Sequence, residues 1–314
     1  MPSISTRSIA KSPATCGNAF TRNASSAALS IFSATSSLPS GLGLDFAEAR
    51  REDKMPLLDR HDEDGIAHLT LNAPDRLNAL SDAMLASLQD QIDALQEDKE
   101  TRAVILSGTG KAFCAGHDLK EMQAKRQSPD KGVAAFRDLF ERCAKVMMGL
   151  QSLPQPVIAQ VHGIATAAGC QLAATCDLAI AATGTRFGVN GVNIGLFCST
   201  PMVALTRAIP RKQAFEMLTT GRFIATDEAL RLGLINKAVP EEDLVQETRT
   251  LAETIAAKLD TAVRIGKRAF YDQTDLTTEA AYAHTAEVMT QNMLDQDTDE
   301  GISAFLEKRP PNWL

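Results

Sequence analysis

The stretch ATAAGCQLAAT, residues 165–175, decides how this chain is interpreted. Its run of small residues is typical of a close-packed helix start. Such a start would aim backbone N–H groups and the positive end of the helix dipole at a ligand. The polar side chain one turn into this helix is an amide, Gln171. The chemistry that an amide can perform there is therefore the central question about function.

Strand-like and helix-like patterns alternate on both sides of this stretch. The spacing of apolar residues predicts an amphipathic helix over residues 81–98, which Ser81 would cap. Alternating or continuous apolar runs predict strands at residues 65–72, 102–108, 156–163 and 177–182.

The remaining segments are predicted to be mostly helical. A long helical region ends near Leu150, and an irregular stretch runs from Thr183 to Pro201. Beyond Pro210 the pattern is mostly helical, and Thr226 would cap one of these helices. Strands that alternate with helices, followed by a helical third, predict an α/β fold with a helical tail. No GxGxxG follows a predicted strand, so a dinucleotide-binding fold has little support.

The first 44 residues differ in composition from the rest. They contain no Asp or Glu, carry three basic residues, and are rich in Ser, Thr and Ala. Such a leader is typical of an organelle transit peptide, which predicts a location in the mitochondrial matrix. One alternative is that these residues form a disordered tail. Another is that translation from an upstream start adds them and that Met55 is the true beginning, in which case the protein would be cytoplasmic. The predicted organisation is a leader over residues 1–54, a core over 55–250 and a C-terminal helical region over 251–314.

Composition and charge exclude several classes of function. The net charge of −7 argues against a nucleic-acid partner, because phosphate binding requires a basic surface. No run of about 18 apolar residues occurs, so no membrane span is predicted. The six cysteines form no CxxC pair and the five histidines stand singly, so no metal site is predicted. Four of the cysteines lie in apolar or small-residue runs and are expected to be buried, reduced thiols.

A series of motifs, in order along the chain, resembles the enoyl-CoA hydratase/isomerase (crotonase) superfamily. The resemblance runs from about residue 60 to the C-terminus. Residues 165–181 and 191–201 are similar to its mitochondrial enoyl-CoA hydratase domain-containing subgroup. The motifs are NAL at 78–80, KAFCAGHDLKEM at 111–122, PVIAQVHGIATAAGCQLAATCDLAIA at 156–181, FGVNGVNIGL at 187–196, TGRFIATDEALRLGLINKAVP at 220–240 and EGISAFLEKR at 300–309.

The resemblance implies a fold, a ligand and an assembly. The fold would be a crotonase-like spiral of ββα units with C-terminal helices that form trimers. The ligand would be an acyl-CoA thioester, bound as substrate or effector, with no separate cofactor. The chain would associate with copies of itself as a trimer or a hexamer.

The resemblance also implies an oxyanion hole. A thioester carbonyl that gains enolate character needs two hydrogen-bond donors on its oxygen, and backbone N–H groups at a helix start suit this role. By motif match the donors would be the N–H groups of His117 and Ala168. Ala167 and Ala168 stand where relatives place glycine, so their methyl groups would narrow the pocket around the acyl chain.

The acid–base half of the family site is predicted to be absent. Hydratases of this family carry one glutamate at the position of Gln171 and a second at the position of Gly191. Two carboxylates are needed because one accepts a proton while the other donates one. An amide has no usable pKa, and glycine has no side chain. Since each such group is worth about 10²–10⁴-fold in rate, hydration is expected to be very weak. Gln171 could orient a water or a ligand group, but it could not deprotonate one.

Several residues near this site allow more than one interpretation. The His117 ring could act as a base or pack at the pocket wall. Asp118 could fix its loop or act as an acid. Asn190 and Asn193 could form turns or position a water. By resemblance, the substrate-binding residues would be Asp118, Leu119, Lys120, Gly169, Phe305 and Lys308.

The last two of these residues would contact the adenine end of coenzyme A from a C-terminal helix. The alternative is that Phe305 packs within the helices and Lys308 lies in solvent. Two functional hypotheses follow from the sequence as a whole. The first is an enzyme that stabilises an enolate of a short or branched acyl-CoA, with weak or ordinary hydration as a variant. The second is a non-catalytic acyl-CoA-binding regulator.

Overall fold

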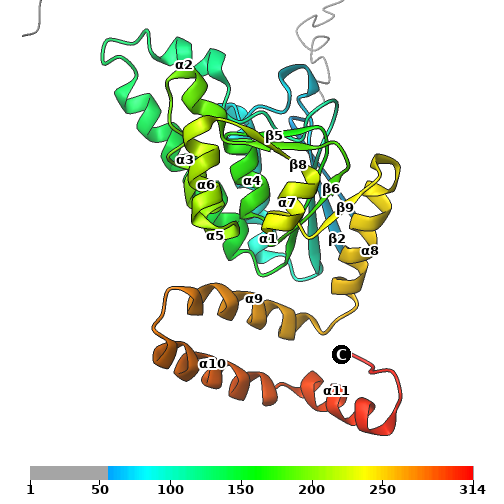
Figure 1. Ribbon diagram of the computed structural model, residues 1–314. Helices are drawn as coiled ribbons and strands as arrows, with labels where there is room; N and C mark the ends of the chain where they lie inside the picture. The colour runs from blue at the N-terminus through cyan, green and yellow to red at the C-terminus, as the bar shows by residue number, and fades with distance from the viewer. Residues whose placement is uncertain (1–55, 314) are drawn as a thin grey trace, which may run out of the picture. The chain divides into compact units, whose positions relative to one another are not determined.

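A computed structural model describes residues 56–313 of the chain, and its strands form two sheets (Figure 1). The leader predicted over residues 1–54 lies outside the described residues. The larger sheet contains, in spatial order, β1 (Leu58–Glu63), β2 (Ile66–Leu71), β3 (Ala103–Gly108), β4 (Val157–Val161), β6 (Leu178–Ala182) and β9 (Lys237–Val239). The smaller sheet contains β5 (Ile164–Thr166), β7 (Arg186–Gly188) and β8 (Phe223–Ala225).

Strand pairing in the larger sheet is mostly parallel. β1 and β2 form an antiparallel hairpin, and each later strand pairs in parallel with its neighbour. Each parallel connection needs a crossover, and helices provide it. β4 and β5 precede one helix, and β6 and β7 precede the next, so paired strands followed by a helix repeat along the chain.

The helices vary in length from one to about five turns. The α-helices are α1 (Asp82–Glu97), α2 (Leu119–Lys125), α3 (Val133–Ser152), α4 (Ala168–Thr175), α5 (Pro201–Ala208), α6 (Arg211–Thr220), α7 (Thr226–Leu232), α8 (Leu244–Ala256), α9 (Asp260–Thr274), α10 (Thr278–Met293) and α11 (Gln296–Glu307). The 3₁₀ helices are η1 (Pro74–Arg76), η2 (Asn190–Ile194) and η3 (Glu241–Asp243).

The larger sheet is covered on both faces. Leu69, Leu106 and Ala159 point to one face and pack in the main core with residues of α1, α3 and α4. Ile105 and Ile158 point to the other face, which α8 covers (Figure 1). Burial on both faces explains why β3 and β4 are nearly continuous apolar runs and not strict alternations. The helix α8 runs across residues 250 and 251, where the sequence predicted the end of the core.

Two predictions of local structure are wrong. The stretch 183–201, predicted to be irregular, contains β7 and η2. The region beyond Pro210 is mostly helical, as predicted, and also contains the short strands β8 and β9. Strands of three residues are too short to show alternation. The helical region predicted to end near Leu150 is two helices, α2 and α3. Thr226 is the first residue of α7, and Ala225 is its N-cap, because the Thr226 hydroxyl donates instead to the carbonyls of Ala182 and Thr185.

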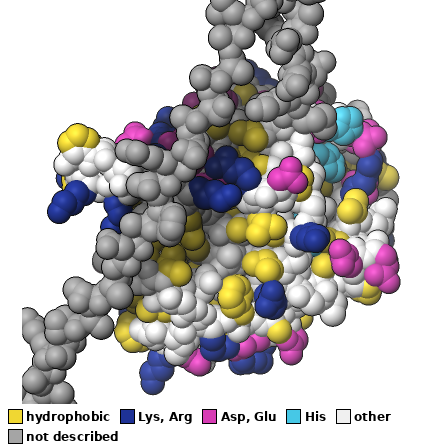
Figure 2. Space-filling model, turned by 90° about the horizontal axis from the view of Figure 1, so that it is seen from above, with side chains coloured by type: hydrophobic (Ala, Val, Ile, Leu, Met, Phe, Trp, Pro, Cys, Tyr) yellow, Lys and Arg dark blue, Asp and Glu magenta, His cyan; other side chains and the backbone are white. Residues whose placement is uncertain are grey.

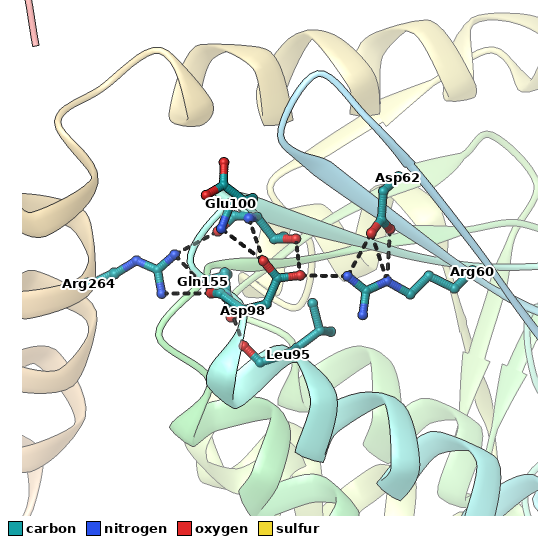
Figure 3. Close-up of polar contacts among 8 residues, drawn as sticks. Arg60, Asp62, Leu95, Asp98, Glu100, Gln155 and Arg264 are labelled. Atoms are coloured by element: carbon teal, nitrogen blue, oxygen red, sulfur yellow. Dashed lines mark hydrogen bonds and ion pairs between the residues drawn. The ribbon is translucent and has the colours of Figure 1, made fainter. Parts of the chain in front are cut away.

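Ser81 caps α1 as predicted, accepting a hydrogen bond from the Met84 N–H. At the other end of α1, Asp98 organises a network of hydrogen bonds and ion pairs (Figure 3). Its carboxylate accepts a 2.7 Å bond from Arg60 on β1, while Gln155 donates to the Asp98 carbonyl at 3.0 Å. Burial opposes ionisation of Asp98, but hydrogen bonds from Thr101 and Arg60 lower its pKa to about 2.

Polar contacts attach α9 to the core. Arg264 donates to the Thr101 carbonyl at 2.8 Å, beside the Asp98 network (Figure 3). The buried Lys267 ammonium donates to Asp177 at 2.7 Å and also to the carbonyls of Leu150 and Gln155. Charge-assisted hydrogen bonds thus help to hold α9 on the core.

The surface of the described residues is mixed in character. On the face seen from above in Figure 2, hydrophobic side chains lie among basic and acidic ones. None of the helices between residues 56 and 313 combines the length and apolar character that crossing a membrane would require. Large apolar side chains remain exposed on the C-terminal helices, including Phe270, Tyr282, Leu294 and Phe305.

Candidate functional site

A mostly apolar cavity of about 320 Å³ lies at the start of α4. It is formed by the loop before α2, by α2 and α3, by the end of β5, and by the segment from η2 to α5. Its lining residues are Ala115, His117, Leu119, Met122, Phe140, Thr166, Ala167, Ala168, Asn190, Gly191, Ile194, Leu196, Phe197, Cys198, Ser199, Thr200 and Pro201.

Two backbone N–H groups at this cavity have no partner among residues 56–313. Ala168 is the first residue of α4, where no intrahelical acceptor is available. His117 precedes the N-cap of α2, and its N–H makes no backbone hydrogen bond within the described part of the chain. Both residues line the cavity, so the two predicted oxyanion donors are brought to one place.

Two glycines, Gly116 and Gly169, allow the loop before α2 to lie close to the start of α4, where the two donors are. A Cβ on Gly116 would lie 3.1 Å from the Ala168 nitrogen and 2.9 Å from the Thr166 carbonyl oxygen. A Cβ on Gly169 would lie 2.0 Å from the Cys114 carbonyl oxygen. Any side chain at either position would force the loop before α2 away from α4.

Ala167, the N-cap of α4, has a strained backbone. Its φ of 51° and ψ of −118° are normally accessible only to glycine, because a Cβ crowds the neighbouring peptide. Its own N–H donates to the Gly188 carbonyl at 2.9 Å, which holds the turn in place. The turn directs the next N–H, that of Ala168, away from the regular hydrogen bonding of β5.

Replacing Ala167→Gly should therefore stabilise the protein. Relief of the strain is worth about 1–3 kcal/mol, and the added chain entropy of glycine removes about 0.5–1 kcal/mol of this. We expect the free energy of unfolding in urea to rise by about 1 kcal/mol. Ala173→Gly, in the middle of the same helix, is the matched control and should destabilise. A loss of stability in Ala167→Gly would contradict the backbone assignment.

The two positions predicted to carry glutamates in relatives lie differently. Gln171 is 4% exposed and does not line the cavity, and its side-chain oxygen is buried without a hydrogen-bond partner among the described residues. Gly191 does line the cavity. A Cβ on Gly191 would lie 2.3 Å from the Leu196 carbonyl oxygen and 2.8 Å from the Cys198 sulfur. The segment that follows η2 therefore fills the space that a side chain at residue 191 would need.

The imidazole of His117 forms part of the cavity wall. Its ring packs edge-on against Phe140, with ring centroids 5.7 Å apart. Nδ1 lies 3.4 Å from the Leu80 carbonyl oxygen, and Nε2 is buried without a partner among the described residues. Burial lowers the pKa of His117, so the ring is neutral at pH 7.

Asp118 serves as the N-cap of α2. Its carboxylate accepts hydrogen bonds from the N–H groups of Lys120 and Glu121 and pairs with Arg76. Burial would raise its pKa, but the backbone N–H of Glu121 and the Arg76 charge lower it. Asp118 is therefore an ionised carboxylate that caps α2 and does not line the cavity. It fixes the loop and is not placed to donate a proton.

Of the predicted substrate-binding residues, Leu119 alone lines the cavity. Lys120 is exposed on α2, and Gly169 packs against Cys114. Phe305 and Lys308 lie at the end of α11, outside the cavity lining, and Phe305 is 81% exposed.

Part of the cavity wall consists of residues that the sequence did not indicate as functional. Met122 and Phe140 come from α2 and α3, where the helical pattern marks them only as apolar. Thr166 and Asn190 meet across the cavity wall, and the Thr166 hydroxyl donates to the Asn190 side-chain oxygen at 2.6 Å. No motif predicted this pairing, since the two residues are 24 positions apart.

The cysteines of the described chain are free and buried. Burial raises the pKa of the Cys114, Cys143 and Cys170 thiols to about 12. Burial also raises the pKa of Cys198, the one cysteine in the cavity wall. Within residues 56–313, no group of His, Cys, Asp and Glu side chains is arranged to hold a metal ion.

Comparison with known families identifies the class of protein. The enoyl-CoA hydratase/isomerase family profile matches residues 61–314, and this chain belongs to that family. The mitochondrial enoyl-CoA hydratase domain-containing protein 3 of Xenopus laevis is 46% identical over 258 residues, which cover 82% of this chain and 86% of that protein. The human protein of the same name is 44% identical over 275 residues, covering 88% of this chain and 87% of its own length.

Solved structures confirm the crotonase fold that the motifs predict. An enoyl-CoA hydratase from Mycobacterium smegmatis is 53% identical, with a TM-score of 0.79, and the match covers 82% of this chain and 99% of that one. The structure of human enoyl-CoA hydratase domain-containing protein 3 is 44% identical, with a TM-score of 0.78, and covers 82% and 100%. The resemblance to the domain-containing subgroup is likewise confirmed.

Proposed function

We propose that this chain binds acyl-CoA thioesters and is at most a very slow hydratase. The observation that carries the proposal is the pair of unpartnered N–H groups, of His117 and Ala168, at the wall of one apolar cavity. A thioester carbonyl oxygen placed between them would satisfy both donors, and the acyl chain would occupy the apolar lining. The dipole of α4 adds to the donor at Ala168.

The lining also supports the proposed weakness in hydration. Among the described residues that line the cavity there is no Asp or Glu, so no carboxylate is available to activate a water. Gln171 is buried behind the wall, and Gly191 has no side chain. Acyl-CoA would thus be held and its carbonyl polarised, without the paired acid and base.

One feature favours a second candidate function, a slow enolising enzyme. If Nδ1–H of His117 donates to the Leu80 carbonyl, Nε2 carries the lone pair. Nε2 is buried with no partner among the described residues, and His117 is one of the residues that line the cavity. A neutral imidazole with a lowered pKa can accept a proton from the α-carbon of a bound thioester. Exchange of α-protons of butyryl-CoA with deuterated water, and its loss in His117→Gln, would distinguish an enzyme from a regulator.

Binding can be tested with a matched pair of ligands. Butyryl-CoA should bind about 30-fold more tightly than free coenzyme A, because its chain buries apolar groups worth about 2 kcal/mol. S-butyl-CoA, a thioether without the carbonyl oxygen, should bind about tenfold more weakly than butyryl-CoA, since two hydrogen bonds are lost. Calorimetric titration measures all three affinities. Failure of butyryl-CoA to bind at millimolar concentration would refute the proposal, and equal binding of the thioether would refute the oxyanion hole.

The relatives and the exposed apolar side chains support proposals for the location and the assembly of this chain. The relatives are named mitochondrial proteins, and we propose that residues 1–54 direct this chain to the same compartment. The exposed apolar side chains of α9–α11 support self-association as a trimer or hexamer. In such an assembly, the proposed contact of Phe305 and Lys308 with the adenine end of coenzyme A would come from the C-terminal helix.

A further inference from the structure

The hydrogen-bonded pair of Thr166 and Asn190 is a polar feature in an otherwise mostly apolar wall. Thr166 ends β5 and Asn190 begins η2, and both residues line the cavity. Their 2.6 Å hydrogen bond runs from the Thr166 hydroxyl to the Asn190 side-chain oxygen. The bond fixes the orientation of the amide, because its oxygen is engaged on the side of Thr166.

The pair lies close to the proposed carbonyl site. Thr166 precedes Ala168 by two residues, so their Cα atoms are at most about 7 Å apart. Asn190 is the immediate neighbour of Gly191, which also lines the cavity. A group on the second, third or fourth carbon of an acyl chain, held by its carbonyl at Ala168, would fall within the same range.

The pair leaves one hydrogen-bond donor free. With its oxygen engaged, the Asn190 amide still has its nitrogen, and no hydrogen bond joins that nitrogen to another residue of the described chain. The residues described at the cavity wall include no Lys or Arg. The imidazole there is neutral, since burial lowers the pKa of His117. A carboxylate on the acyl chain would therefore find no compensating charge, whereas a neutral oxygen would find a donor.

We infer that Thr166 and Asn190 determine specificity, selecting acyl groups that carry a neutral, hydrogen-bond-accepting oxygen near the thioester. The inference rests on the proposed binding of acyl-CoA at this cavity. Asn190 Nδ2 donates to the hydroxyl or keto oxygen of the acyl group, and Thr166 positions the amide. An unsubstituted acyl chain covers the amide nitrogen without satisfying it, which weakens its binding.

The test compares butyryl-CoA, 3-hydroxybutyryl-CoA and acetoacetyl-CoA by calorimetry on the full chain. The wild-type protein should bind both oxygenated ligands about tenfold more tightly than butyryl-CoA. Asn190→Leu should abolish that preference and should bind butyryl-CoA more tightly than the wild-type protein does, because no amide nitrogen is then left unsatisfied. Asn190→Asp keeps an acceptor for the Thr166 hydroxyl but loses the donor. It should abolish the preference for acetoacetyl-CoA, which cannot donate, more completely than that for 3-hydroxybutyryl-CoA.

Asn193→Leu is the matched control, because Asn193 lies in the same 3₁₀ helix and does not line the cavity. It should leave the preference unchanged. Equal affinities for the three ligands in the wild-type protein, or a preference that survives Asn190→Leu and Asn190→Asp, would overturn the inference while leaving acyl-CoA binding intact. Absence of butyryl-CoA binding would instead remove the proposed function, and this inference with it.

Discussion

Crotonyl-CoA should be hydrated by this protein several orders of magnitude more slowly than by a relative that carries both glutamates. Each missing acid or base is worth about 10²–10⁴-fold, although the product of two such factors is an upper range, because groups that act together are not additive. The loss of enoyl absorbance under saturating substrate measures the rate. A rate typical of the family would contradict the proposed site, and His117 would then be the first residue to test as the proton carrier.

The structure changes the outcome expected for restoring the glutamates. From the sequence alone, Gln171→Glu together with Gly191→Glu should raise the rate. The Leu196 carbonyl oxygen, 2.3 Å from the Cβ that residue 191 would acquire, opposes this. We expect the double variant to remain inactive and to lose about 1–3 kcal/mol of stability through overpacking. Gln171→Glu alone, which avoids that clash, is the control and should also leave the rate unchanged, because no second group assists it.

Of the substitutions proposed here, loss of the Asp177 carboxylate should lower the free energy of unfolding most. Asp177 accepts hydrogen bonds from the Val157 N–H at 2.6 Å, from the Lys267 ammonium at 2.7 Å and from the Tyr271 hydroxyl at 2.7 Å. Burial lowers the pKa of Lys267, and Asp177 is the charge that opposes this. Asp177→Ala leaves a buried ammonium unpaired, which costs about 3–5 kcal/mol. The melting temperature should fall by about 6–20 °C in calorimetry.

Two further variants separate charge from simple loss of contact. Tyr271→Phe removes one neutral donor and should cost only about 1 kcal/mol. Lys267→Met removes the buried charge and keeps the length of the side chain, and combined with Asp177→Ala it should recover part of the lost stability. A melting temperature in Asp177→Ala equal to that of Tyr271→Phe would show that the ion pair does not hold α9 on the core.

Much of the fold could be predicted from the sequence because its signals are local. Four strands of the larger sheet, β2, β3, β4 and β6, appear in the sequence as apolar or alternating runs, and Ser81 marks the start of α1 by its capping side chain. The short strands β7, β8 and β9 could not be predicted, because three residues carry no usable periodicity. Their positions depend on pairing with distant strands, as β7 does with both β5 and β8.

The site divides along the same line. His117 and Ala168 can be predicted as donors because each stands in a short motif that carries the resemblance to the family. The burial of Gln171 and the filled space at Gly191 could not be predicted, since both depend on tertiary packing, which at Gly191 involves the segment after η2. Asn190 could be interpreted only as a turn former or a water-positioning residue until its contact with Thr166 was known.

The buried cysteines allow opening of the folded structure to be measured by the rate of thiol modification. Thiol reagents attack the thiolate, and the raised pKa values of Cys114, Cys143 and Cys170 leave almost none of it in the folded state. These three thiols can therefore be modified only when the structure opens. The modification rate in the absence of denaturant then reports how often this opening occurs. Cys198 differs from these three because it is one of the residues that line the cavity, where an occupant would shield it. Its modification rate would report occupancy of the cavity, while the other three report the integrity of the core.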